Sequence, residues 1–256
     1  MIIDLEQQLA GHVFAFMLIF TRIGAGVMMF PGIGEAFVPV RTRAFFALVV
    51  TFLMLPILLP QVPVMPTQIS DMTWLLIREA LIGIFFTSIL RLIMGMIEVA
   101  GTIVAMQTGL SNAMILNPAL ASQSALTSAL LSMAGIVLIF VSGLDHFLLR
   151  ALMETYIIFP ISAPFPLGDI VEFFIRVVSK SFSVGVQMAS PFIVVGLLLY
   201  LTMGTMQKMM PQVQLFLVLI PIQIWGGFFL FSTIISVMLL FWLQTYDETI
   251  SSLFMS

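Results

Sequence analysis

The length of the uncharged stretches limits most strongly how this chain can fold. No Asp, Glu, Lys or Arg occurs within 44–70, 99–144, 181–207 or 209–246. A helix that crosses the hydrocarbon core of a bilayer needs roughly 20 mostly apolar residues, and each stretch is longer than that. A transmembrane barrel would instead show short segments of alternating polarity. The stretches therefore indicate an all-α integral membrane protein.

Composition supports this class and narrows the partners. Hydrophobic residues make up 61% of the chain and charged residues 8%, whereas soluble domains carry about 25% charged residues. A net charge of −3 leaves no basic footprint, so nucleic acid is not expected as a partner. The first residues carry acids where a signal peptide has positive charges, so we expect the first apolar run to be retained.

Apolar runs separated by Gly and Pro breaks predict about six long helices in a single domain, 1–256. Lys and Arg fall equally on both sides of a six-span topology, so the positive-inside rule gives no orientation. Either the six-span topology is wrong or the chain does not cross the bilayer as a simple serpentine. A shorter apolar segment at 147–160 follows the fourth helix. The expected helices lie at 9–30, 44–60, 74–105, 125–144, 181–206 and 213–243.

Several charges fall within or beside these apolar helices, where an unpaired charge is costly. The spacing of Glu79, Arg91 and Glu98 predicts that they share roughly one helix face. Two interpretations stay open: snorkelling or ion pairing within this chain, or a face buried against other subunits or lining an aqueous path. The residues concerned are Arg22, Arg78, Glu79, Arg91 and Glu98.

No pattern of catalytic or cofactor-binding residues stands out. His12 and His146 are the two histidines, and neither has a second ligand at metal spacing. Asp145 and His146 are adjacent, which should not bring their side chains together on a helix. No nucleophile elbow or phosphate loop occurs. The chain is expected to need no cofactor and not to be an enzyme, and Gly24 and Gly26 are expected to be close-packing positions.

The segment MQTGLSNAMILNPALASQS, residues 106–124, carries no charge. It is too polar for a good membrane span and too apolar for an ordinary solvent loop. Methionine is unusually frequent, with 20 of 256 residues. Because Met is flexible and polarizable, the methionines could form a compliant seal or serve as ordinary apolar filler.

Three stretches together, 22–56, 107–160 and 190–231, resemble the FliR family of flagellar export-gate proteins, called SctT in virulence-type secretion systems. The order of these stretches, their spacing and the length of the chain agree with the family pattern over nearly the whole chain. The chain departs from the family at Asn117, where Asp is common, at Lys208, where Arg is common, and at Ser162, where Gly is usual. The matching positions include Pro31, Gly34, Pro39, Arg43, His146, Arg150, Pro160, Pro191, Lys208 and Pro211.

The resemblance implies a structural, channel-forming subunit of the flagellar type III protein export gate in the bacterial inner membrane, at the flagellar basal body. Its expected partners are FliP-like and FliQ-like subunits in a hetero-oligomer, FlhB-like and FlhA-like proteins, unfolded export substrates and lipid. Residues 1–175 would resemble a FliP subunit and 176–256 a FliQ helix pair, with helices bent into hairpins. The interior charges would then face other subunits.

The resemblance also implies a role for residues 107–124, the central segment, which would plug the lumen of the gate. Irregular backbone at membrane depth is tolerated only when it is buried in protein or lines a cavity, and its apolar side chains could exclude water and ions. The alternative is a tight loop packed on its own chain. The residues expected in the plug are Gln107, Gly109, Leu110, Asn112, Met114, Ile115, Leu116, Asn117 and Pro118.

A second class of function remains open from the residues alone. Broken helices, interior charges and an uncharged central loop are also found in secondary transporters and small-solute channels. A transporter should act alone or as a homo-oligomer. A gate subunit should be found within a hetero-oligomer, so association separates the two.

Overall fold

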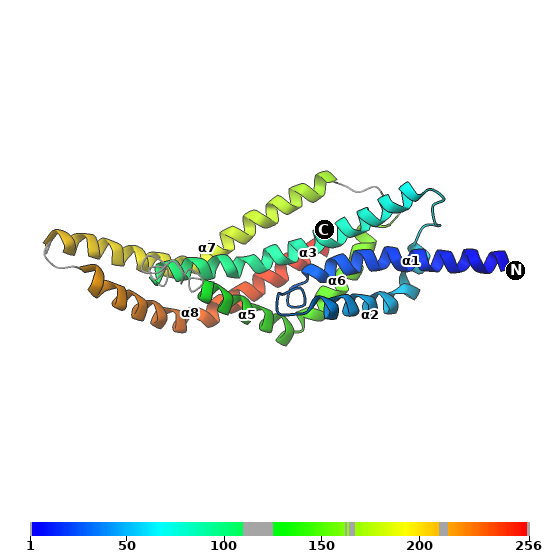
Figure 1. The fold of residues 1–256 in the computed structure, drawn as a ribbon. Coiled ribbons are helices and arrows are strands. Elements are labelled where there is room, and N and C mark those ends of the chain that lie inside the picture. Colours follow the sequence, from blue (N-terminus) through cyan, green and yellow to red (C-terminus); the bar gives the residue numbers. More distant parts are fainter. Residues whose placement is uncertain (1, 110–124, 162, 164–166, 210–214, 255–256) are drawn as a thin grey trace. The chain divides into compact units, whose positions relative to one another are not determined.

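The computed structural model describes residues 2–109, 125–161, 163, 167–209 and 215–254, and its regular structure is helical (Figure 1). Five of its helices are long and apolar enough to cross a membrane, or six if the pair on either side of Ser142 and Gly143 forms one span. The predicted all-α membrane class is confirmed. The helices are α1 (Ile2–Met29), α2 (Val40–Leu58), α3 (Ile69–Gln107), α5 (Ala125–Val141), α6 (Leu144–Ile158), α7 (Leu167–Met209) and α8 (Leu215–Phe254), with a 3₁₀ turn η1 (Leu59–Gln61).

Two helices extend well beyond the apolar windows that predicted them. Helix α7 begins at Leu167 and includes Glu172, Arg176 and Lys180, and α8 continues past Asp247. Charge-free length therefore underestimated both helices. The physical reason is that charged side chains at the end of a helix do not break it, whereas Gly, Pro and capping do.

The chain packs as two compact units. The first contains Met1–Leu92, Gly143–Ile175 and Phe254–Ser256, and the second contains Ile93–Ser142 and Arg176–Leu253. One break lies between Ile175 and Arg176, the boundary that the family resemblance implies, but the second unit also takes in much of α3 and α5. The division into a FliP-like and a FliQ-like part therefore stays a prediction.

In the first unit, α1 packs against α2, α3 and α6. Gly26 on α1 lies against Leu152 of α6 and Thr87 of α3, and Gly83 of α3 lies directly beneath the Arg22 carbonyl of α1. These glycines let backbones approach closely, which is how helices associate in membranes. Gly26 is therefore a close-packing position, as predicted.

Gly24 differs from this prediction. A Cβ there would meet only the ring of Phe20, on its own helix. Gly24 and Gly26 are two residues apart and therefore point to different sides of the helix. Only one of them faces a neighbouring helix.

In the second unit, the C-terminal half of α3 packs with α5, α7 and α8. Gly101 faces Ser128 on α5, and Gly185 on α7 faces Val99. The Trp242 indole of α8 is fully buried and donates a hydrogen bond to the Ile93 carbonyl over 3.4 Å. The core of this unit therefore also forms around small residues on α3 and α7 and one large aromatic side chain on α8.

Helices α7 and α8 form an antiparallel pair within this unit. The rings of Phe192 and Phe231 lie 6.3 Å apart, and Tyr200 lies beside Gln223. Tyr200 follows Phe192 by eight residues on α7, whereas its partner Gln223 precedes Phe231 by eight residues on α8. The two helices therefore run antiparallel. The two helices at the C-terminal end of the chain therefore pack as an antiparallel pair, and its likeness to a FliQ helix pair stays a prediction.

We expect Gly83→Ala to destabilise the first unit, because the new Cβ would overlap the Arg22 carbonyl. Overpacking of this kind costs typically 1–3 kcal/mol. The matched control is Gly95→Ala on the same helix, where no atom lies within 4 Å and where alanine should gain roughly 0.5–1 kcal/mol. Unfolding midpoints in detergent would compare the two. Equal midpoints would contradict the close approach.

Candidate functional site

The best-defined polar cluster of the first unit is an ion pair between α1 and α3. The Arg22 Nε donates to Glu79 Oε2 over 2.6 Å, and both side chains are 0% exposed. Both residues lie inside candidate membrane spans. Burying charges without a partner is very costly, so this pair explains how each helix can carry a charge in its apolar interior.

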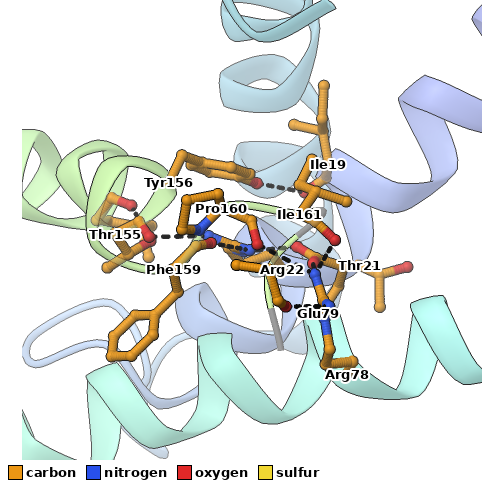
Figure 2. Close-up of polar contacts among 12 residues, drawn as sticks. Ile19, Thr21, Arg22, Arg78, Glu79, Thr155, Tyr156, Phe159, Pro160 and Ile161 are labelled. Carbon is orange, nitrogen blue, oxygen red and sulfur yellow. Dashed lines mark hydrogen bonds and ion pairs between the residues drawn. The ribbon is translucent and has the colours of Figure 1, made fainter. Parts of the chain in front are cut away.

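The Arg22 guanidinium also binds the end of α6 (Figure 2). Its Nη1 donates to the Thr155 carbonyl over 3.1 Å and its Nη2 to the Phe159 carbonyl over 2.9 Å. The last carbonyls of a helix lack intrahelical partners and carry the negative end of the helix dipole. A buried cation at this place therefore stabilises the end of α6.

The ring of Tyr156 completes the environment of the guanidinium. The Arg22 Cζ lies 4.0 Å from the ring centroid, within the range of a cation–π interaction. The Tyr156 hydroxyl in turn donates to the Ile19 carbonyl over 3.4 Å. One side chain of α1 therefore contacts both α3 and α6.

Arg78, next to Glu79, holds the segment that follows α6. It donates to the carbonyls of Pro160, Ile161 and Ala163, and its Nη2 lies 3.6 Å from Glu79 Oε1. Figure 2 shows both arginines converging on this glutamate. The two arginines and Glu79 thus connect α1, α3 and the end of α6.

The other two charges predicted for the interior have different environments. Arg91 has a side chain that is 42% exposed and pairs with Glu35 over 3.3 Å, and Glu98 is exposed. The prediction that Glu79, Arg91 and Glu98 share one face is wrong. Twelve residues rotate a helix by about 120° beyond whole turns, so Arg91 and Glu98 share a side that Glu79 does not.

The turn between α1 and α2 carries several positions of the family pattern. Arg43 donates to the Glu35 carbonyl over 2.6 Å and to the Val38 carbonyl over 2.8 Å. Pro31 and Gly34 are buried, and a Cβ at Gly34 would meet the backbone of α1 at 2.8 Å. These residues shape the connection between the two helices.

Two pairs of charged or titratable side chains lie nearer the surface of α6 than the buried Thr155 and Tyr156 do. His146 is 86% exposed, and its Nδ1 lies 3.1 Å from Asp145 Oδ1, so the prediction that these adjacent side chains would not meet is wrong. The reason is that Asp145 lies in the first turn of the helix, where a short carboxylate can reach its neighbour. Arg150 is exposed and pairs with Glu154 at 3.0 Å.

The remaining family positions mark helix boundaries and interiors. Pro39 is the N-terminal cap of α2, and Pro160 follows α6. Pro191 lies inside α7, and Lys208 lies in the last turn of that helix, where a cation complements the dipole. Pro211 lies outside the described residues.

Most of the predicted plug also lies outside the described residues, namely Leu110, Asn112, Met114, Ile115, Leu116, Asn117 and Pro118. Of that set, the structure describes Gln107, the last residue of α3, and Gly109, which is buried with a φ of 77°. Few residues other than glycine adopt that conformation. The right-handed helical conformation therefore does not continue through Gly109.

An apolar pocket of about 50 Å³ lies where the central segment leaves and rejoins the helices. Both flanks of the segment line it: Val104 and Thr108 on one side, and Leu126 and Leu130 on the other. Gly227 and two phenylalanines of α8 complete it. The two flanks of 110–124 are therefore close to one another and to α8.

Sequence reasoning missed the partners of the buried charges. It identified Arg22 and Glu79, but not Thr155, Tyr156 or the Phe159 carbonyl. The apolar segment at 147–160 was the available signal. A helix that ends among apolar residues buries its last carbonyls, and these carbonyls then need polar partners such as a buried charge.

Within the described part of the chain, no group of three His, Cys, Asp or Glu residues is placed to hold a metal ion. The buried charges instead contact each other and the backbone of their own chain. The fold and this cluster define a helical membrane protein with several candidate spans, joined internally by a buried ion pair.

Comparison with known proteins gives the family. Residues 13–249 match the model of the bacterial export proteins, family 1, and the chain belongs to this family. It is 35% identical over 239 residues to the flagellar biosynthetic protein FliR of Caulobacter vibrioides, covering 93% of this chain and 95% of the relative. The resemblance to FliR proteins is therefore confirmed.

Two further relatives show how broad the similarity is. The flagellar biosynthetic protein FliR of Bacillus subtilis is 26% identical over 246 residues, or 93% of each chain. The Yop proteins translocation protein T of Yersinia pestis is 28% identical over 148 residues, or 57% of each chain. The similarity thus extends from proteins named for flagellar biosynthesis to one named for the translocation of Yop proteins.

We expect Arg22→Met to destabilise the first unit strongly, because it leaves Glu79 buried without its closest partner. Breaking a buried pair in this way costs about 3–5 kcal/mol. Arg22→Met combined with Glu79→Leu should recover part of the loss. Arg150→Met is the control, since its exposed pair contributes about 1 kcal/mol or less. Thermal unfolding in detergent measures all three, and an equal effect of the two single changes would contradict the role of the buried pair.

Proposed function

We propose that this chain is a structural, channel-forming subunit of a bacterial type III protein export gate, of the flagellar kind. The observation that carries the proposal is the family match over 13–249. The relatives that match over nine-tenths of both chains bear the name flagellar biosynthetic protein. Its place would be the inner membrane, at the flagellar basal body.

The described helices suit a subunit that acts within an assembly. Many large apolar side chains are exposed, including Phe45 and Phe52 on α2 and Trp225 and Phe229 on α8. Such surface must meet lipid or other subunits. The proposed neighbours are FliP-like and FliQ-like subunits, with FlhB-like and FlhA-like proteins beside them, and unfolded export substrates would pass through.

The central segment would close the channel at rest. Its flanks support this proposal, because α3 ends at a sharp backbone turn and both flanks line one apolar pocket beside α8. A segment held at both ends can occupy a lumen without being free to leave it. The uncharged sequence of 110–124 suits a constriction that excludes ions.

The first test is association. After co-expression with its FliP-like and FliQ-like neighbours, the protein should be found as a single copy within a large hetero-oligomer when its native mass is measured in mild detergent. A monomer or a symmetric homo-oligomer, with the neighbours expressed but unbound, would refute the gate proposal. That outcome would favour the transporter alternative.

The second test is leakage. Shortening 107–124, or Met114→Gly, should leave the assembly intact and raise ion leakage across the membrane, because the seal loses apolar side chains. Met65→Gly, in the irregular connection that precedes α3, is the matched control, since it removes the same side chain at a place outside the central segment. Ion flux into vesicles that contain the assembly measures the effect. Equal leakage in all assembled variants would count against the plug.

A further inference from the structure

The C-terminal end of α3 has a partner for each of its last four carbonyls. Three of them are satisfied by the two residues that follow the helix. The Val104 carbonyl accepts from the Thr108 N–H at 2.9 Å, the Ala105 carbonyl from the Thr108 hydroxyl at 3.3 Å, and the Met106 carbonyl from the Gly109 N–H at 3.3 Å. Residues 108 and 109 thus supply the partners of three of these four carbonyls.

The fourth carbonyl, that of Gln107, is bound from another helix. The Gln223 Nε2 of α8 donates to it over 2.8 Å, and the same amide lies 3.5 Å from the Tyr200 hydroxyl of α7. Gln223 is 5% exposed, although it lies in an apolar helix. A buried amide must find partners, and its shortest contact is with this carbonyl.

Two glycines of α7 and α8 lie against side chains next to this hydrogen bond. A Cβ added at Gly227 of α8 would lie 2.6 Å from the Thr108 side chain, and one at Gly196 of α7 would overlap the Gln107 side chain. Gly227 is one turn along α8 from Gln223, so both face the end of α3. Two glycines and one amide thus bring α7 and α8 into contact with residues 107–108.

We propose that Gln223 is a positioning residue for the central segment, a role that rests on the proposed function. By binding the Gln107 carbonyl, its amide fixes the point from which 110–124 departs. Gly227, one turn along α8, allows the close approach beside this bond. Movement of α8 would therefore be transmitted to the start of the segment through one hydrogen bond and one glycine contact.

The test uses thiol labelling in the co-expressed complex. The chain has no cysteine, so Thr108→Cys introduces a single thiol at a position that is 4% exposed. Gln223→Met keeps the length of the side chain but removes the donor. Losing one hydrogen bond should raise the local opening of the end of α3, and hence the labelling rate at position 108, by on the order of tenfold.

Three controls separate this effect from general loosening. Gln187→Met makes the same change at an exposed glutamine of α7 that donates to the Ser183 hydroxyl on its own helix, and it should leave labelling at position 108 unchanged. Ala189→Cys, at a fully buried position of α7, should stay unlabelled in Gln223→Met. Hydrogen exchange at the Thr108 and Gly109 amides gives a second measurement without any thiol.

Adjacent glycines provide an independent pair of variants. In the Thr108→Cys protein, Gly227→Ala should push the residue at position 108 away from α8 and increase its labelling. Gly226→Ala should not, because no atom lies within 4 Å of the added Cβ. Unchanged labelling and exchange at 108–109 in both Gln223→Met and Gly227→Ala would overturn the proposal.

The proposed function fails by a different measurement. If shortening 107–124 leaves leakage unchanged, the plug is wrong even when labelling shows that Gln223 anchors α3. If shortening raises leakage but Gln223→Met alters neither leakage nor labelling, the plug stands and the positioning role is wrong.

Discussion

The arrangement of the first unit depends on one buried arginine. Arg22 binds Glu79 on α3, two carbonyls at the end of α6 and the face of Tyr156. Each contact offsets part of the cost of removing a charge from water, and none would suffice alone. Because these partners belong to α3 and to the end of α6, while Arg22 itself lies on α1, the guanidinium is satisfied only when all three helices are in place. A single charge therefore specifies how three apolar helices pack.

Glycine supplies the complementary constraint. Apolar helices in lipid gain little from hiding apolar surface, so close backbone approach and interhelical hydrogen bonds decide how they associate. A Cβ at Gly83 in the first unit would clash with the Arg22 carbonyl, and a Cβ at Gly227 in the second would clash with the Thr108 side chain. In each unit, the close approach stands beside a buried polar contact, Arg22 with Glu79 and Gln223 with Gln107. In each unit, the closest packing between helices and the buried polar contact therefore lie next to one another.

The two polar contacts act on different parts of the molecule. The contact of Arg22 holds the end of α6 and the chain that follows it, while that of Gln223 holds the end of α3, from which the central segment departs. Both use a side chain of one helix to satisfy the last carbonyls of another. A helix end that is buried away from water needs such partners, and in both units a polar side chain of another helix supplies them.

The sequence alone determined the helical membrane class, the positions of the main helices and the family, because long charge-free runs and ordered Gly and Pro positions are local features of the chain. It also identified Arg22 and Glu79 as interior charges. Only the tertiary structure decided that they pair with each other, that Arg91 and Glu98 lie on the exposed side, and that Gln223 binds the end of α3. Those outcomes depend on which helices are neighbours, and apolar helices of similar composition leave that choice to a few glycines and polar groups far apart in sequence.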